Sequence, residues 1–247
     1  MSSTTGLASS VGTAVAVVAG LVACVAVAGY ATGRGGVENA HFTVMRRAGG
    51  RTHLSFELRR YAPCVAAVTR VQGGRGADTR RMTSQGFRAV AAYIFGGNAQ
   101  RAPPAASHPL MPEGGGGGRS IAMTAPVVSA PAGNGDINVS FIMPSRFQHV
   151  DELPVPLARN VELHELPARL EAVHAFGGAY LDDAATLAMA RRLLAALRAD
   201  GLKPAEGAAD IDGERVELHV YSYDPPWVLP FFRLNELSIV CEDGAST

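Results

Sequence analysis

The chain has 247 residues, 47% of them hydrophobic and 18% charged, so it carries enough apolar material to bury one sizeable core. Its 22 basic residues equal its 22 acidic residues, which leaves no surplus of positive charge for binding the phosphates of nucleic acids. The three cysteines, Cys24, Cys64 and Cys241, are far apart and lack a Cys-x-x-Cys spacing, which argues against a disulfide framework and a zinc knuckle. A nucleic-acid-binding protein and a small disulfide-rich or zinc module are therefore disfavoured, and a reducing compartment fits best.

Residues 1–40 differ in composition from the rest of the chain. They begin rich in Ser and Thr, and Val11 to Ala31 contains no charged residue. A helix of this length spans about 30 Å, the thickness of the apolar core of a bilayer, so the segment is predicted to form an apolar helix that anchors the protein in a membrane. The first basic residues, Arg34, Arg46 and Arg47, follow the segment. The positive-inside rule then keeps the folded domain on the cytoplasmic or stromal side.

A cleaved targeting sequence is the alternative interpretation of the same segment. The first 37 residues contain no acidic residue, as in organelle transit peptides, and Ala26-Val27-Ala28 resembles a small-residue cleavage site. In that case the mature protein would lie in the stroma or lumen of an organelle such as the chloroplast. The sequence leaves both interpretations open.

Residues 41–243 are predicted to form one globular domain. Two stretches inside it have the composition of loops: Gly73 to Arg81 is glycine-rich and polar, and residues 99–119 combine a proline-rich half with five consecutive glycines. The longer stretch is predicted to be a flexible insertion and not a domain boundary, because neither side of it supplies a closed set of strands.

A pattern of strand, helix, strand and strand fills the first half of the domain. Phe56 to Val71 alternates as a strand does and is interrupted at Pro63, where a bend is expected. Ser84 to Phe95 has the apolar spacing of a helix, which Gly96-Gly97 ends. Two further strands are predicted, at Ile121 to Val128 and at Ile137 to Met143.

The second half repeats the pattern. Val161 to Phe176 is a strand interrupted at Pro167, in the place that Pro63 takes in the first half. Asp182 and Asp183 can cap a helix from Ala184 to Ala199, and two more strands follow, at Glu214 to Tyr223 and at Asn235 to Cys241. Two such units predict an α+β fold, in which a distorted antiparallel β-barrel built from two strand-helix-strand-strand repeats carries two helices packed on it.

Residues with catalytic side chains do not form a recognisable motif. His164, His174 and His219 fall on predicted strands, but no two histidines have the i, i+4 spacing of a helical zinc site. The acidic residues that could supply a carboxylate pair, which are Glu162, Glu165, Glu171, Asp182 and Asp183, are of the kind that is usually solvated or caps a helix. No set of nucleophile, base and oxyanion site is recognisable, and the glycine runs lack the Gly-Lys-Ser/Thr context of a phosphate loop. The sequence therefore does not indicate an enzyme.

Apolar and aromatic residues favour a binding protein instead. The helix predicted at Ser84 to Phe95 has an apolar face, and the loop Asp224 to Leu229 holds Trp227, the only tryptophan, next to prolines that exclude a helix or a central strand. This face and this loop fit two descriptions, a core with its lid or the walls of a site for a planar ligand.

Five short strings carry a resemblance to a known family. They are FELRRY at Phe56 to Tyr61, IAMTAPV at Ile121 to Val127, FIMP at Phe141 to Pro144, YDPPW at Tyr223 to Trp227 and RLNE at Arg233 to Glu236. In this combination and order, from about His41 to Cys241, the chain resembles the SOUL haem-binding protein family. The fold of that family, a distorted antiparallel β-barrel of duplicated halves with two helices, agrees with the repeat inferred from the residues.

The resemblance implies non-catalytic, non-covalent binding of haem or a related tetrapyrrole. The family's site is a shallow hydrophobic surface beside the first helix and near the loop between the last two strands. The corresponding residues in this chain are Phe87, Arg88, Ala91, Ile94, Trp227 and Val228, with Arg88 expected to pair with a propionate. The first conserved strand carries no histidine here, so no fixed axial ligand to the iron is expected.

Two other hypotheses compete with haem binding. Some family members carry methionine and lysine on the first helix and a basic residue in the loop, whereas this chain has Phe87, Ala91, Ala92 and Val228. This difference favours a structural or protein-interaction module that kept the fold and lost the haem site. A third hypothesis is an enzyme acting on a tetrapyrrole or another hydrophobic substrate, for which His164 or His174 would be the candidates.

Overall fold

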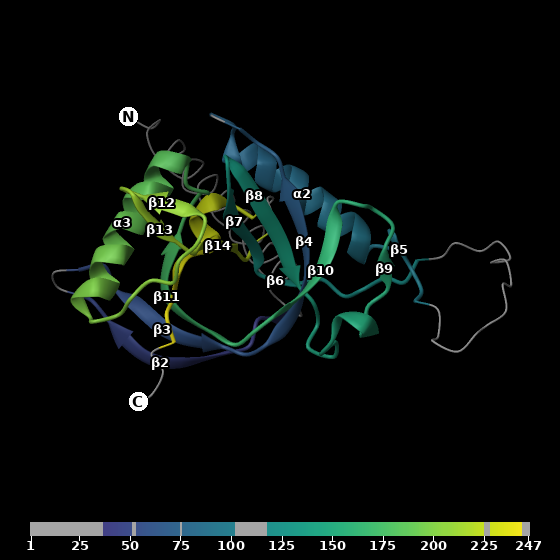
Figure 1. Cartoon of the computed structure of the whole chain (residues 1–247), viewed down its shortest axis with the longest axis horizontal. Coiled ribbons are helices and arrows are strands. Elements are labelled where there is room, and N and C mark those ends of the chain that lie inside the picture. The colour runs from purple at the N-terminus through teal and green to yellow at the C-terminus, as the bar shows by residue number, and fades with distance from the viewer. Residues whose placement is uncertain (1–36, 51–52, 75, 102–117, 225–227, 244–247) are drawn as a thin grey trace, which may run out of the picture.

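The computed structural model describes residues 37–50, 53–74, 76–101, 118–224 and 228–243. Its main feature is a nine-stranded antiparallel sheet that curls into a half-barrel (Figure 1), with the strand order β10-β4-β8-β7-β14-β15-β11-β3-β2. The strands are β2 (Phe42–Ala48), β3 (Phe56–Tyr61), β4 (Cys64–Val71), β7 (Val127–Gly133), β8 (Asp136–Ile142), β10 (Val161–Leu166), β11 (Arg169–Gly177), β14 (Leu218–Ser222) and β15 (Leu234–Cys241).

Smaller elements surround this sheet. Three two-stranded pairs join β1 (Glu38–Asn39) to β6 (Thr124–Ala125), β5 (Asn98–Ala99) to β9 (Val155–Pro156), and β12 (Ala209–Ile211) to β13 (Glu214–Val216). Two helices, α2 (Thr79–Ile94) and α3 (Asp183–Ala199), cover the outer face of the curled sheet (Figure 1), and two single 3-10 turns are η1 (Val150–Glu152) and η2 (Pro230–Phe232).

The two predicted bent strands are confirmed, and they tie the two halves together. β3 and β4 are the two arms of one strand bent at Pro63, and β10 and β11 are the arms of the other, bent at Pro167. β4 pairs with β10, whereas β3 pairs with β11. Each half of the sheet therefore contains one strand arm that belongs, in sequence, to the other half.

Each helix packs against its own half of the sheet. α2 covers a cluster that includes Val65, Val90 and Phe141, and α3 covers a cluster that includes Leu58, Leu197 and Leu237. Since side chains alternate along a strand, the residues between these apolar positions point to the inner face of the curl. On that inner face Arg59, Glu171 and Glu236 are buried together with Tyr61 and Tyr221.

Several elements differ from their predicted bounds. α2 begins at Thr79, five residues before the predicted start, because the side chain of Asp78 accepts hydrogen bonds from the backbone N–H groups of Arg80 and Arg81 at 3.0 and 3.3 Å. The end of the predicted Gly73 to Arg81 loop is thus helical. Strand β2 was not predicted, because none of its seven residues is buried and most are exposed, as at the edge of a sheet.

The predicted α+β class, antiparallel sheet and two helices are confirmed, and the sheet is a half-barrel in place of the distorted barrel. The apolar helix predicted within residues 1–40 lies outside the described residues, as does most of the insertion predicted at residues 99–119. Among the helices that the structure describes, none combines the length and the apolar character needed to cross a bilayer.

Candidate functional site

Helix α2 carries four of the predicted site residues, and they differ in exposure. Ile94 is buried, with 1% of its surface exposed, and packs in the cluster under the helix. Phe87 and Ala91 are half-buried along the flank of the helix, and Arg88 is exposed. The flank therefore offers apolar surface beside a basic side chain, whereas Ile94 supports the helix from below.

Packing and hydrogen bonds fix the position of this flank. The ring of Phe87 lies against that of Phe141 on β8, with 5.4 Å between the centroids. At the far end of the helix the hydroxyl of Tyr93 donates to the carbonyl of Pro154 at 2.9 Å, and the side-chain amide of Asn98 donates to the carbonyl of Tyr93 at 2.6 Å. These contacts hold both ends of the apolar flank against the sheet.

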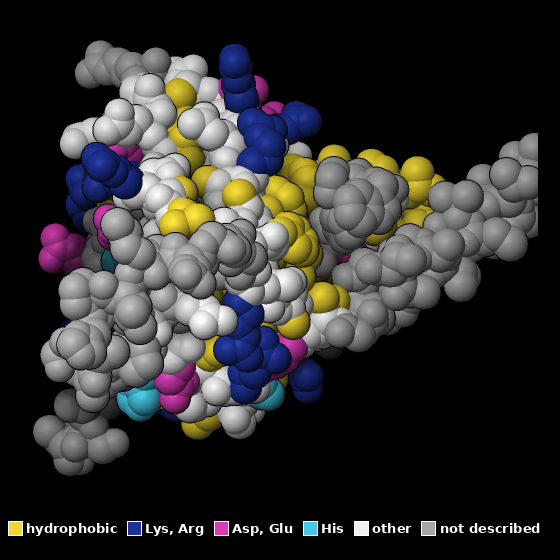
Figure 2. Space-filling view, turned by 90° about the vertical axis from the view of Figure 1, so that its right-hand side faces the viewer, with side chains coloured by type: hydrophobic (Ala, Val, Ile, Leu, Met, Phe, Trp, Pro, Cys, Tyr) yellow, Lys and Arg dark blue, Asp and Glu magenta, His cyan; other side chains and the backbone are white. Residues whose placement is uncertain are grey.

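The end of the molecule beyond α2 also exposes apolar side chains. Phe95 and Leu157 are each 66% exposed, and Val155 on β9 is 41% exposed. Figure 2 looks onto this end and shows hydrophobic side chains between two groups of basic side chains. An amphipathic ligand with negative charges would find both kinds of contact here.

The loop between β14 and β15 is the second part of the predicted site. Val228 is buried, at 4% exposure, and its carbonyl accepts a hydrogen bond from Nε of Arg233 at 2.8 Å. Trp227, the remaining predicted residue, lies outside the described residues. Among the described residues of this loop, Phe231 and Phe232 in η2 are exposed aromatic residues, at 64% and 43%, which the sequence prediction did not include. The adjacent phenylalanines in the sequence were the signal that could have indicated them.

Strand β7 lies between the helix and this loop. Its first residue, Val127, packs against the cluster that holds Phe87, and it pairs with Ser222 at the end of β14, just before the loop. Helix α2 itself packs on β4 and β8, whereas η2 in the loop contacts β11, so the two parts of the predicted site lie over different strands of the sheet.

A network of charged and hydroxyl groups occupies the inner face of the half-barrel. The terminal nitrogens of Arg59 donate to both carboxylate oxygens of Glu236 at 2.9 Å, and the hydroxyl of Tyr223 donates to the same carboxylate at 2.7 Å. Nε of Arg59 donates to Glu57 at 2.9 Å. The two bonds to Glu236 make a bidentate ion pair. Arg59 is 6% exposed and Glu236 is 3% exposed, so the pair is largely removed from water.

Glu171 is the centre of a second group on the same face. Its carboxylate accepts hydrogen bonds from Tyr221 and Ser238, both at 2.7 Å, and from Nε of Arg169 at 2.5 Å, and it lies 3.6 Å from Nδ1 of His219. Burial opposes the charge of Glu171, but the hydrogen bond and charge of His219, the charge of Arg169 and the Ser238 hydroxyl outweigh it and lower the pKa of Glu171 to about 2.

His219 is charged in this arrangement. Burial favours its neutral form, but hydrogen bonds to Glu171 and Glu217 outweigh burial and raise the pKa of His219 to about 9. The other two strand histidines do not join it: His174 lies on the helix-covered face, where its Nδ1 is 2.7 Å from the carbonyl of Ser55, and His164 forms an exposed pair with Glu162 at 3.1 Å. The candidates of the enzyme hypothesis are therefore not brought together.

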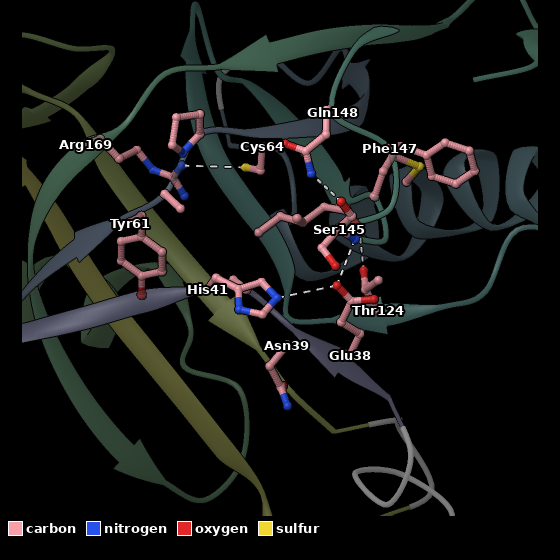
Figure 3. A pocket seen from close by; sticks show the side chains of 15 residues that line it. Glu38, Asn39, His41, Tyr61, Cys64, Thr124, Ser145, Phe147, Gln148 and Arg169 are labelled. Carbon is pink, nitrogen blue, oxygen red and sulfur yellow. Dashed lines mark hydrogen bonds and ion pairs between the residues drawn. The ribbon is translucent and has the colours of Figure 1, made fainter. Parts of the chain in front are cut away.

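One cavity of about 240 Å³ opens beside this network (Figure 3). It lies at the bend between β3 and β4, and Tyr61, Cys64 and Arg169 line its inner side. His41 and Glu38, from the segment before β2, line the opposite side. Sequence reasoning did not include this cavity, because its walls come from five separate segments of the chain.

These places offer charged, hydroxyl and apolar contacts. In the part of the chain that the structure describes, no three His, Cys, Asp or Glu side chains are placed to hold a metal ion. The inner network consists of groups that neutralise and hydrogen-bond one another, and the α2 flank combines apolar and basic contacts.

The amino-acid sequence matches the family model of the SOUL heme-binding protein over residues 37–240. The chain belongs to the SOUL haem-binding protein family. The match covers most of the chain and includes both halves of the repeat, so the resemblance carried by the five strings is confirmed.

No curated protein matches the sequence significantly. Among solved structures, the C-terminal domain of EcmrR is 11% identical, with a TM-score of 0.49, and covers 78% of this chain and 99% of its own. A hydrolase from Listeria innocua is 8% identical, with a TM-score of 0.45 over 78% of this chain and 94% of its own. SAV2435, bound to tetraphenylphosphonium, is 10% identical, with a TM-score of 0.40 over 76% and 94%. Likenesses this weak carry no conclusion about function.

Proposed function

We propose that the protein binds haem or a related tetrapyrrole non-covalently, as a carrier or buffer and without catalysis. The observation that carries the proposal is membership of the SOUL haem-binding family over residues 37–240. A tetrapyrrole supplies a flat apolar ring with two propionates, and the protein's part is to cover one face of the ring and to pair its negative charges. The N-terminal apolar segment would hold such a carrier at a membrane or direct it to an organelle.

The flank of α2 is the proposed contact surface. Phe87 and Ala91 would meet the apolar face of the ring, and the exposed Arg88, one turn from Ala91, would pair with a propionate. Phe231 and Phe232 add exposed aromatic surface in the loop that holds Trp227 and Val228. Because Ile94 and Val228 are buried, their proposed role is to support these contacts.

A hemin titration of the full-length protein tests the proposal. We expect a saturable shift of the Soret band, and we expect Arg88→Glu to weaken binding by about 1 kcal/mol, or roughly five-fold, because it replaces an attraction to a propionate by a repulsion. Arg81→Glu is the matched control, since Arg81 is exposed on the same helix two turns earlier. A titration without saturation contradicts haem binding, and equal effects of the two variants contradict the α2 site.

A module that has lost haem binding is the second candidate function. The observation that favours it is the burial of Ile94 and Val228, which leaves a smaller apolar surface for a ligand than the predicted residue set suggests. A Trp227→Ala variant separates the two functions. If the variant lowers stability and leaves hemin affinity unchanged, the aromatic loop covers the protein's own core, as a structural module requires.

A further inference from the structure

The cavity at the bend between β3 and β4 has an apolar side and a polar side. Ile142, Met143 and Phe147 contribute apolar walls, each of them with less than 8% of its surface exposed. Arg169 lies across from them at the start of β11, and Figure 3 shows its guanidinium directed towards Cys64 at the edge of the cavity. The site is thus amphipathic.

Its volume sets the size of what can enter. Sites for drug-sized ligands usually measure about 300–1,000 Å³. The cavity has about 240 Å³, so it takes a smaller group. A whole tetrapyrrole ring is too large, whereas one arm of it, or a short organic molecule, is of the right size.

Arg169 has hydrogen-bonding capacity left for such a group. A guanidinium carries five N–H donors. Nε of Arg169 donates to Glu171 at 2.5 Å, Tyr221 is a further hydrogen-bonding neighbour, and Nη1 points to Sγ of Cys64, a weak acceptor 4.0 Å away. The guanidinium also lies over the ring of Tyr61, 4.8 Å from its centroid, which fixes its plane. An oxygen acceptor in the cavity would replace the poor contact to sulfur by a charge-assisted hydrogen bond.

The remaining N–H donors of Arg169, and not a surplus of positive charge, favour an anion over a cation. Arg169 shares the carboxylate of Glu171 with His219, 3.6 Å away, and His219 has Glu217 as its second, half-exposed partner. Glu38, the acidic residue on the opposite wall, accepts a hydrogen bond from the backbone N–H of Ser145 at 2.7 Å and pairs with His41 at 3.6 Å. Its charge is engaged, and donors remain at Arg169.

We propose that this cavity binds a carboxylate group carried on a small apolar body. Arg169 donates to the carboxylate, and Ile142, Met143 and Phe147 contact the apolar part. Two ligands share this chemistry: a free short-chain or aromatic acid, and the propionate arm of a tetrapyrrole whose ring lies outside the cavity. The second source rests on the proposed function, whereas the first does not.

Calorimetric titration of the full-length protein with hexanoate and with hexanamide is the test. Hexanoate should bind and hexanamide should bind at least ten-fold more weakly, because a hydrogen bond to a charged group contributes about 1.5–3 kcal/mol. Arg169→Lys keeps the positive charge but loses the planar guanidinium with its paired N–H donors, so it should weaken the binding of hexanoate by a similar factor. Arg59→Lys is the matched control, since Arg59 also lies on the inner face, pairs with a buried carboxylate and does not line the cavity. Equal binding of acid and amide, or equal effects of the two lysine variants, overturns the proposal.

A measurement on the unmodified protein decides the question if Arg169→Lys does not fold. The methyl resonance of Met143, in the cavity wall, should shift with hexanoate, and that of Met189, in α3, should not. If hexanoate leaves the methyl resonance of Met143 unshifted, the proposal is overturned.

Competition then identifies the source of the carboxylate. If hemin displaces hexanoate and hemin dimethyl ester does not, the cavity holds a propionate. If hemin and hexanoate bind together, the ligand is a separate small acid. A protein that binds hexanoate in this way but fails to bind hemin refutes the proposed haem function and leaves the carboxylate site standing.

Discussion

His219 and Glu171 show how single residues store pH-dependent stability on the inner face. The folded protein raises the pKa of His219 from its ordinary 6.5 to about 9, through Glu171 and Glu217. A raised pKa in the folded state means that the folded protein binds the proton more tightly than the unfolded chain does. The stabilisation is fully present below the unfolded pKa of 6.5 and is lost as pH rises through 9.

Urea unfolding as a function of pH measures this effect. Between pH 6.5 and 9 the free energy of unfolding should fall by about 1 kcal/mol per pH unit, close to the limit for one titrating group. In the His219→Gln variant the slope should be markedly smaller over the same range. His164→Gln, an exposed histidine on β10, is the control and should keep the wild-type slope. If the slope survives in His219→Gln, another group is responsible for it.

Helix α2 depends on one glycine for its distance from the sheet. A Cβ added at Gly86 would lie 2.5 Å from Cγ2 and 2.6 Å from Cβ of Val139, which is fully buried in β8. Val139 is β-branched and cannot turn away without leaving its preferred rotamer. The absence of a side chain at Gly86 thus lets the helix approach the sheet closely enough for Phe87 to pack against Phe141.

We therefore expect Gly86→Ala to destabilise the protein, by about 1–3 kcal/mol for overpacking, even though alanine favours a helix more than glycine does. Ser84→Ala, at an exposed position of the same helix, should change stability by no more than about 0.5 kcal/mol. Val139→Ala added to Gly86→Ala should restore part of the loss. Denaturant unfolding measures all three variants, and a Gly86→Ala variant more stable than wild type would refute the close approach.

The elements that the sequence predicts well are those with local signals. Pro63 and Pro167 interrupt alternating strands, and Asp182 caps α3 within one residue of the predicted start, because proline and capping residues act on their immediate neighbours. The start of α2 was predicted late, since Asp78 lies in a polar, glycine-rich stretch that masks its capping role. Strand β2 gave no signal, because an exposed edge strand needs no apolar alternation.

The inner face of the whole molecule could not be predicted from the sequence. Arg59 and Glu236 are 177 positions apart, and Glu171 and Tyr221 are 50 apart, yet they form buried hydrogen bonds. When each strand is considered by itself, its charged residues are predicted to face solvent. These residues reach a common interior only because β3 pairs with β11 and β4 pairs with β10. The cavity beside Arg169 arises from the same exchange of strand arms between the two halves.

The exchange of strand arms between the two halves also predicts how the molecule unfolds. Because β3 pairs with β11 and β10 pairs with β4, unfolding of one half removes a strand arm from the sheet of the other. The two halves should therefore unfold in one cooperative transition, as small single domains usually do. Trp227 reports on the second half through its fluorescence, and the thiol of Cys64, at the first bend, reports on the first half through its rate of alkylation.

Both probes should give the same midpoint in urea. Ile239→Ala in β15, which removes a fully buried side chain of the second half at a cost of about 2–5 kcal/mol, should lower both midpoints equally. Val65→Ala in β4 is the matching change in the first half, and it too should move both midpoints together. Two separate transitions, or a variant that moves only the probe in its own half, would show that each repeat keeps its sheet without the arm exchanged with the other.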